Sequence, residues 1–154
     1  MGFLKYEDTI SGEEGRAYAT INGRVEEMFW LKKFEAKVEK IKKEGKTLNK
    51  RGTQHKARGW KGTGSMTIYY VTTLFRQLML DYMKTGKDIY FDVQITNEDP
   101  TSSIGKQTIV IKGINLDGIT MVLLDVDSED MEEEISFTWQ DADILDSFAK
   151  PTLG

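Results

Sequence analysis

The chain has 154 residues, a length typical of one domain, and 30% of them are charged. It contains no cysteine, which excludes disulfides, thiolate nucleophiles and cysteine-bound metals. The formal net charge of −4 excludes a protein that binds DNA with its whole surface. No apolar run approaches the ~18 residues that a membrane helix needs.

The N-terminal third begins with a segment of low apolar content and continues into an ambiguous region. Residues 1–16 are expected to form an irregular arm, and Asn22-Gly23 predicts a tight β-hairpin. Within 24–43, apolar residues recur at helical spacing, but Phe34, Ala36 and Val38 also alternate with charged residues as in a strand. The spacing slightly favours a helix, whereas the hairpin requires a partner strand.

A strongly basic segment follows, KTLNKRGTQHKARGWKGTG, from Lys46 to Gly64. It carries six Lys or Arg residues, the only histidine and no acid, so the rest of the chain has a formal charge of −10. Five glycines lie within 44–64, and this glycine content predicts a loop.

The remaining two-thirds reads as one helix among strands. SMTIYYV (65–71) predicts a strand. Residues 73–85 predict a helix with Thr72 or Thr73 as N-cap, Gly86 after its end, and a core-facing stripe of Phe75, Leu78, Met79, Tyr82 and Met83. Further strands are predicted at 88–96, 107–116, 119–126 and 134–140, and a short turn at 141–148.

Consecutive strands with short connections favour antiparallel pairing. The predicted fold is therefore mainly β (α+β), an antiparallel β-sandwich or barrel of about six or seven strands flanked by one α-helix. We expect a single domain over 17–148, with a long loop at about 44–62 and a tail at 149–154.

Three features could suggest chemistry, and each fails on its pattern. A lone His55 without cysteines cannot form a usual zinc site, and no G-x-S-x-G motif provides a nucleophile. The acidic run 125–134 lacks the glycine and the glutamate that a calcium loop requires, and a solvated charge run is the better interpretation. GWKGTG is not a phosphate-binding loop. We expect no catalytic, cofactor or metal site.

The basic segment leaves three alternatives open from composition alone. It could be a flexible solvated loop. It could hold single-stranded nucleic acid, with Trp60, Tyr69 and Tyr70 stacking on bases while lysines and arginines hold phosphates. It could also contact the acidic surface of another copy of the chain, with complementary charge setting the register of a self-assembly.

Three blocks of sequence carry a resemblance to a known family. GWKGTGSMTIYY, NEDPTSSIGKQT and EEEISFTW resemble the tail tube proteins of contractile-tailed phages and phage-tail-like particles, in particular those of PBSX-like defective prophages and clostridial tail-like bacteriocins. The resemblance spans about residues 10–148. It implies a small β-barrel-like sandwich with one helix, shared with the tube of type VI secretion systems, in which 24–43 is a long strand.

The resemblance also implies a function and a set of partners. Such proteins are structural, form hexameric rings and stack them into a hollow tube inside a contractile sheath. The implied partners are other copies, the sheath, baseplate, tape-measure and tail terminator proteins, with DNA only as passing cargo and no membrane. The implied location is a virion tail or tail-like particle, assembled in the bacterial cytoplasm.

Candidate assembly residues follow from this reading. In the long loop we expect subunit or ring contacts at Lys50, Arg51, Gln54, His55, Lys56, Arg58 and Trp60. In the N-terminal arm, the apolar Phe3, Leu4 and Tyr6 are expected to be buried by a partner subunit. We further hypothesise that Asp92, Gln94, Glu132 and Glu134 face the lumen or solvent, because an acidic lumen would repel passing DNA.

Overall fold

The computed structural model describes residues 2–153, and within them it forms two β-sheets that share one strand. The strands are β1 (Gly15–Ile21), β2 (Arg24–Glu27), β3 (Leu31–Gly45), β4 (Gln54–Tyr69), β5 (Phe91–Glu98), β6 (Lys106–Leu116), β7 (Glu132–Trp139) and β8 (Asp141–Asp146). The helix α1 spans Leu74–Thr85, and two short 3-10 helices, η1 (Tyr6–Asp8) and η2 (Gly12–Glu14), precede β1.

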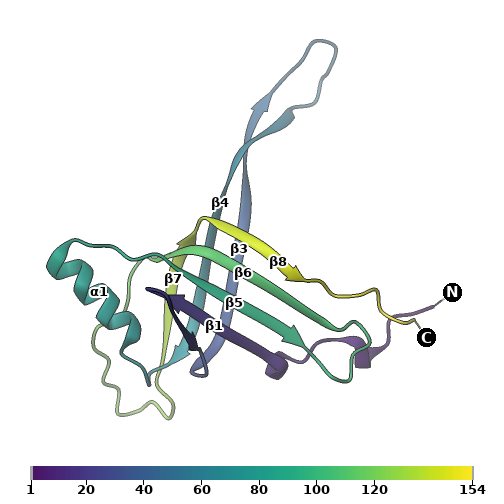
Figure 1. Ribbon diagram of the computed structural model, residues 1–154. Coiled ribbons are helices and arrows are strands. Elements are labelled where there is room, and N and C mark those ends of the chain that lie inside the picture. Colours follow the sequence, from purple (N-terminus) through teal and green to yellow (C-terminus); the bar gives the residue numbers. More distant parts are fainter. Residues whose placement is uncertain (1, 154) are drawn as a thin grey trace.

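The strand order is β2-β1-β5-β6-β7-β4-β3, with β8 paired to β6, and every pair is antiparallel, as predicted. β6 joins the two sheets: most of it pairs with β5 and β8, and its last residues, Asn115 and Leu116, pair with β7. Figure 1 shows β1, β5, β6 and β8 running across β3, β4 and β7, so the sheets pack as a sandwich with crossed strands.

The core lies between the two sheets and follows the predicted alternation. Phe91 and Val93 of β5, and Ile135 and Phe137 of β7, are almost fully buried. α1 closes one end: Phe75 packs edge-on against Trp30, with ring centroids 5.4 Å apart. The helix stripe is confirmed only in part, because Tyr82 and Met83 are 47% and 62% exposed.

Local turn and cap signals are confirmed. Asn22 and Gly23 both have positive φ (52° and 79°), which matches the right-handed twist of the β1–β2 hairpin. Gly86 ends α1 in the left-handed conformation, and its N–H donates to the Tyr82 carbonyl. At the other end, the Thr72 hydroxyl accepts from the Leu74 N–H at 3.2 Å, although Thr73 is the N-cap by backbone.

The segment 24–43 forms strands, not a helix. β2 and β3 are separated only by Met28, Phe29 and Trp30, of which Met28 and Trp30 are buried. The helical spacing is misleading here, since most of β3 beyond Ala36 is exposed on both faces and buries no continuous stripe. The family resemblance is right that this segment is β and not helical, but the single long strand that it implies is broken at 28–30 into β2 and β3, which belong to different sheets.

The loop predicted for 44–64 is wrong over most of its length. β4 begins at Gln54, and only 46–53 form the turn between β3 and β4. Two of the glycines have a packing role instead: a Cβ on Gly62 would lie 2.5 Å from the Trp139 ring, and one on Gly64 would lie 2.5 Å from the Phe137 ring. Gly59, with φ of 141°, sits where the β3–β4 register shifts, as in a β-bulge.

Two further expectations near the C-terminus are corrected. The strand predicted over 119–126 is absent, and the chain there has no ladder partner. The predicted turn at 141–148 contains β8, which pairs with β6. Strand propensity alone does not form a strand, because a ladder needs a neighbouring edge in the right register.

Candidate assembly surface

The most unusual feature is the end of the β3–β4 hairpin, which leaves the body of the protein. β7 pairs with β4 as far as Gly62, so residues 39–61 continue as two strands without a third. Figure 1 shows them rising well clear of the two sheets. We call residues 39–61 the hairpin arm. An isolated two-stranded ribbon without a core is only marginally stable in water.

The hairpin arm is exposed throughout and strongly basic. Every residue from 39 to 61 is exposed. The arm carries nine Lys or Arg and two Glu residues. Within the described chain only Lys61 has a carboxylate within ion-pair distance, Glu39 at 3.8 Å. Eight cations therefore have no acidic partner within residues 2–153, and an acidic surface on another molecule would complement them.

The predicted loop residues all lie on this arm. Lys50 and Arg51 are in the turn at its tip, while Gln54 begins β4 and donates to the Thr47 hydroxyl at 3.2 Å. His55 and Lys56 pair across the ladder with Glu44 and Lys43. The arm thus gathers the whole set on one ribbon: Lys50, Arg51, Gln54, His55, Lys56, Arg58 and Trp60.

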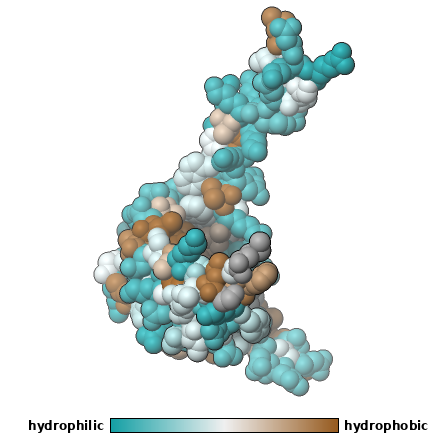
Figure 2. Space-filling model, turned by 90° about the vertical axis from the view of Figure 1, so that its right-hand side faces the viewer, coloured by the Kyte–Doolittle hydropathy of each residue, from teal (hydrophilic) through white to brown (hydrophobic). Residues whose placement is uncertain are grey.

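An apolar groove lies where the hairpin arm joins the body. It has a volume of about 580 Å³ and is lined by apolar residues of four strands together with Lys40 and Asp141. The apolar lining is Val38, Ala57, Gly59, Trp60, Trp139 and Ala142. Figure 2 shows hydrophobic side chains gathered below the mostly hydrophilic arm. The two tryptophan rings pack with centroids 5.3 Å apart, and the Trp139 Nε1–H donates to the Thr63 carbonyl at 2.9 Å.

This groove continues the core face of the β3-β4-β7 sheet beyond the opposing sheet. The cross-strand partners Val38 and Gly62, then Lys40 and Trp60, follow Ala36 and Gly64 on the same face. Within the described residues no second layer covers this extension, so Val38 remains 60% exposed and Trp60 46% exposed. Sequence reasoning placed Trp60 in a loop and missed the groove, because its other half comes from Trp139 and Ala142.

The N-terminal segment is fastened to the body by two carboxylates. The Asp8 carboxylate accepts from the N–H and the hydroxyl of Ser103, both at 2.7 Å, and these bonds lower the pKa of Asp8. The Ser11 N–H donates to Asp99 at 3.1 Å, and hydrogen bonds from Thr101 and then Ser11 lower the pKa of Asp99. Residues 8–14 are therefore ordered against the 99–103 loop.

The three apolar residues before this anchor remain exposed. Phe3, Leu4 and Tyr6 are 71%, 61% and 91% exposed. The segment that leads into β1 lies near the C-terminal segment in Figure 1, away from the hairpin arm. The anchored segment thus presents an apolar tip, as an assembly contact requires.

The four strand residues expected to face a lumen or solvent divide between the two sheets. Asp92 and Gln94 lie on β5 and are half-buried, and Asp92 accepts from the Gly113 N–H at 3.1 Å in a bulge opposite β6. Glu132 and Glu134 lie on β7, where Glu132 pairs with Lys32 at 2.6 Å and Glu134 is exposed. The pairs belong to outward faces of different sheets.

One member of the acidic run is not solvated. Glu133 is 5% exposed and pairs with Arg76 of α1, with Nη1 and Oε1 2.8 Å apart. The expectation of a fully solvated charge run is therefore wrong at this position. Alternation in EEEISFTW already places Glu133 on the face of Ile135 and Phe137, and this signal was available in the sequence.

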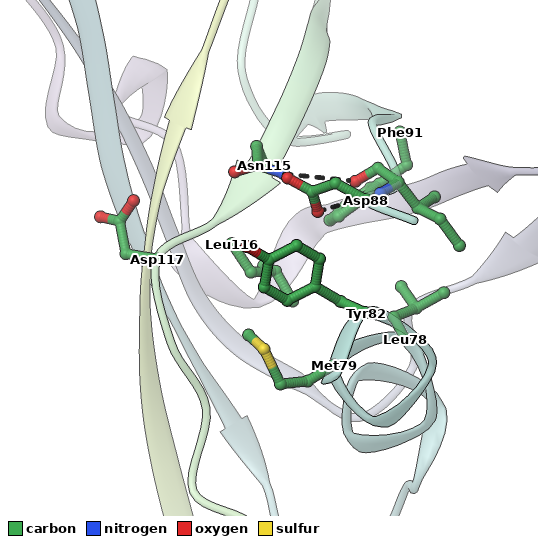
Figure 3. Close-up of a pocket in the computed structure, with 9 residues that line it drawn as sticks. Leu78, Met79, Tyr82, Asp88, Phe91, Asn115, Leu116 and Asp117 are labelled. Carbon is green, nitrogen blue, oxygen red and sulfur yellow. Dashed lines mark hydrogen bonds between the residues drawn. The ribbon is translucent and has the colours of Figure 1, made fainter. Parts of the chain in front are cut away.

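A second hollow lies between α1 and the sheet (Figure 3). It measures about 320 Å³ and is lined by Leu78, Met79, Tyr82, Asp88, Ile89, Phe91, Asn115, Leu116 and Asp117. The Asn115 amide donates to Asp88 at 2.8 Å. No cluster of three or more metal-ligating side chains is found among residues 2–153.

The structure does not bring together the residues of the nucleic-acid hypothesis. Tyr70 is covered by the Arg76 guanidinium, 4.3 Å above its ring centre. Tyr69 and Trp60 lie nine residues apart on β4, which is ~30 Å along a strand. The three aromatic rings therefore do not form one stacking platform. In the same described range, no helix is long and apolar enough to cross a membrane.

Comparison with known proteins decides the family. The family model described as "Phage tail tube protein" matches residues 2–146. This chain is a phage tail tube protein. It is 45% identical over 141 residues to the phage-like element PBSX protein XkdM of Bacillus subtilis (strain 168), covering 92% of this chain and 93% of that relative. The protein YqbM of the same strain is 44% identical over the same shares of the two chains.

Solved structures show the same fold at low sequence identity. A chain of the anti-feeding prophage baseplate superimposes with a TM-score of 0.62 at 11% identity, over 86% of this tail tube protein and 92% of that chain. A chain of the sheath-tube complex of the extracellular contractile injection system PVC superimposes with a TM-score of 0.61 at 11% identity, over 92% and 93%. This tail tube protein is accordingly structural and not an enzyme, as expected.

Proposed function

We propose that this tail tube protein assembles into hexameric rings that stack into the hollow inner tube of a contractile tail or tail-like particle. The observation that carries the proposal is the hairpin arm, a basic ribbon without a core of its own. A chain that exposes such a ribbon gains stability only when a neighbouring subunit covers it.

Edge strands support ring formation. Among the described strands, β2, β3 and β8 each pair on one side only. An unpaired edge offers backbone N–H and C=O groups to a neighbouring chain, and a closed ring of subunits removes such edges. β3 is the longest of the three at 15 residues, so it offers the most extended ladder.

Stacking of rings follows from the position of the arm. A contact between the arm end of one subunit and a different surface of the next is heterologous, and repetition along one axis gives an open filament. The apolar tip at Phe3, Leu4 and Tyr6 provides a second contact on another side of the body.

One outward sheet face would line the lumen. Because Asp92 and Gln94 lie on a different sheet from Glu132 and Glu134, a lumen lined by a single sheet face carries only one of these pairs. Either pair presents carboxylate or amide groups that do not grip a nucleic-acid backbone, so DNA passes without being held.

The other proposed partners correspond to the different surfaces of such a tube. The sheath, the baseplate, the tape-measure protein and the tail terminator would meet the outside, the base, the inside and the end of the stack. Structures of related fold come from a baseplate, a sheath-tube complex and a tube-terminating cap, which supports this arrangement. Assembly would take place in the bacterial cytoplasm and end in the virion tail or tail-like particle.

The experiment is negative-stain electron microscopy of the purified protein alone, with a preformed baseplate added as nucleus in a parallel sample. Rings or hollow tubes are expected from the unaltered chain. The variant Arg51→Glu/Lys56→Glu should lose them, while the matched variant Lys84→Glu/Lys87→Glu, which alters exposed lysines at and after the end of α1, should keep them. Dispersed monomers in both samples would overturn the proposal.

A further inference from the structure

A second segment is as unusual as the hairpin arm and lies at the opposite end of the molecule. Residues 117–131 connect β6 to β7 without regular structure, and we call them the acidic loop. They carry five Asp or Glu residues and no Lys or Arg. None of these five acids takes part in an ion pair within residues 2–153.

The acidic loop also exposes large apolar side chains. Val122, Leu124 and Val126 are 81%, 86% and 90% exposed. Val122 and Leu124 lie in an irregular stretch, and Val126 follows in the turn that the Ser128 N–H closes on the Asp125 carbonyl. Three large apolar side chains facing water within five residues are costly, because each forgoes the favourable free energy of burial.

The body holds the acidic loop by its flanks and leaves these side chains free. The Tyr70 hydroxyl accepts from the Leu123 N–H at 3.3 Å, and the Thr120 carbonyl accepts from Arg76 at 3.5 Å. Ile119 packs against the core. The segment around Leu124 is therefore presented at a fixed place and not left as a free tail.

The two segments are complementary and cannot meet within one chain. The acidic loop leads directly into β7 at Glu132, which pairs with Tyr69, whereas the groove centres on Trp60, ~30 Å away along β4. Figure 1 shows the loop below the sheets and the arm above them. One end offers unpaired cations around an apolar groove, and the other offers unpaired acids beside apolar side chains.

We propose that the acidic loop of one subunit docks in the apolar groove of a second copy. Val122, Leu124 and Val126 fill the groove between Val38 and the two tryptophans, and the loop's carboxylates meet Lys40 and Lys42 of the arm. Complementary charge steers the approach, and apolar burial holds the contact. Because the two surfaces lie at opposite ends, each subunit binds one neighbour above and another below, which propagates without closing.

This docking of loop in groove rests on the proposed self-assembly and specifies the contact that mediates it. The test is therefore designed to distinguish failure of the docking from failure of self-assembly. The chain has no cysteine, which makes introduced cysteines specific reporters. Ala57→Cys places a thiol in the groove, and Leu124→Cys places one on the loop. A disulfide requires Cα atoms within about 7 Å, so it forms readily only where the two sites meet.

Ala57→Cys protein is mixed with tagged Leu124→Cys protein under mild oxidation, and the heterodimer is identified by mass. We expect roughly tenfold more heterodimer than with Met83→Cys as partner, an exposed control on α1, because docked thiols face each other at millimolar effective concentration. Rings or tubes without this cross-link would leave self-assembly standing and overturn the pairing. Neither particles nor cross-link would overturn both.

Charge exchange provides the second measurement. Lys40→Asp/Lys42→Asp and Asp125→Lys/Asp127→Lys should each abolish assembly alone, since like charges then face each other in every contact. In a mixture, subunits of the two variants can alternate. Every contact between unlike variants then joins a loop and an arm of opposite charge, so particles should return. Assembly of either variant alone at the level of the unaltered chain would contradict the pairing.

Discussion

The Arg76 guanidinium and the Glu133 carboxylate form a salt bridge of 2.8 Å whose side chains are only 11% and 1% exposed. The bridge fastens α1 to β7 directly beneath the acidic loop. Arg76 also donates to the Thr120 carbonyl and lies over the Tyr70 ring, so one side chain connects the helix, the end of β4 and the loop. The bridge therefore helps to fix α1, the end of β4 and the acidic loop relative to one another.

Removal of one partner of this bridge should be strongly destabilising. Glu133→Ala leaves Arg76 without its counter-charge in a nearly closed site, and breaking such a buried pair costs about 3–5 kcal/mol. Urea denaturation of the isolated subunit measures the loss. Glu134→Ala, an exposed neighbour on the same strand, is the control and should change stability by less than about 0.5 kcal/mol. Equal effects of the two substitutions would contradict a buried bridge.

The glycines of the β3–β4 hairpin should differ sharply in their tolerance of a methyl group. Gly62→Ala places a Cβ 2.5 Å from the Trp139 ring and 2.8 Å from the Trp139 carbonyl oxygen, so the strand or the ring must shift. Overpacking of this kind costs about 1–3 kcal/mol. Gly45→Ala, at the end of β3 with open space around it, is the matched control. A thermal melt that ranks the two variants equally would show that the ring does not pack there.

Acid should release the N-terminal segment. The folded-state pKa values of Asp8 and Asp99 are lowered by hydrogen bonds, so their contribution is present above the ordinary carboxyl pKa and is lost as pH falls below about 4. Hydrogen exchange of residues 8–14, compared at pH 6 and pH 3, measures the release. Asp8→Asn should weaken protection already at pH 6 and reduce the pH dependence to the part that Asp99 contributes; unchanged protection at pH 3 in the unaltered chain would contradict the anchor.

Salt should weaken assembly driven by the hairpin arm. Surface charges are screened within ~10 Å at 0.1 M salt and ~3 Å at 1 M. The mass fraction in rings or tubes, measured by sedimentation, should therefore fall as salt rises, and it should fall as steeply in the assembly-competent control Lys84→Glu/Lys87→Glu. A steep increase in assembly with salt in the unaltered chain would instead indicate that apolar burial alone drives the contact.

The local structural features of this chain can be predicted without its tertiary structure. Asn22-Gly23, the helix before Gly86 and the alternation in β5 and β7 each depend on neighbours within a few residues, and each is found where the pattern predicts it. The family resemblance correctly predicts strand for 24–43, where spacing alone favours a helix.

Only the tertiary structure decided the features that depend on residues far apart in the chain. A glycine in the sequence is equally consistent with a turn and with close packing of another group against the backbone. Gly62 and Gly64 are interpreted correctly only once the Trp139 and Phe137 rings are known to pack against them. Residues 119–126 have the composition of a strand but pair with no strand inside the described part of the subunit. The sequence by itself determined the family, the antiparallel β-fold and the basic segment; the tertiary structure turned that segment into a coreless arm with an apolar groove, because grooves and ladders are made by residues far apart in the chain.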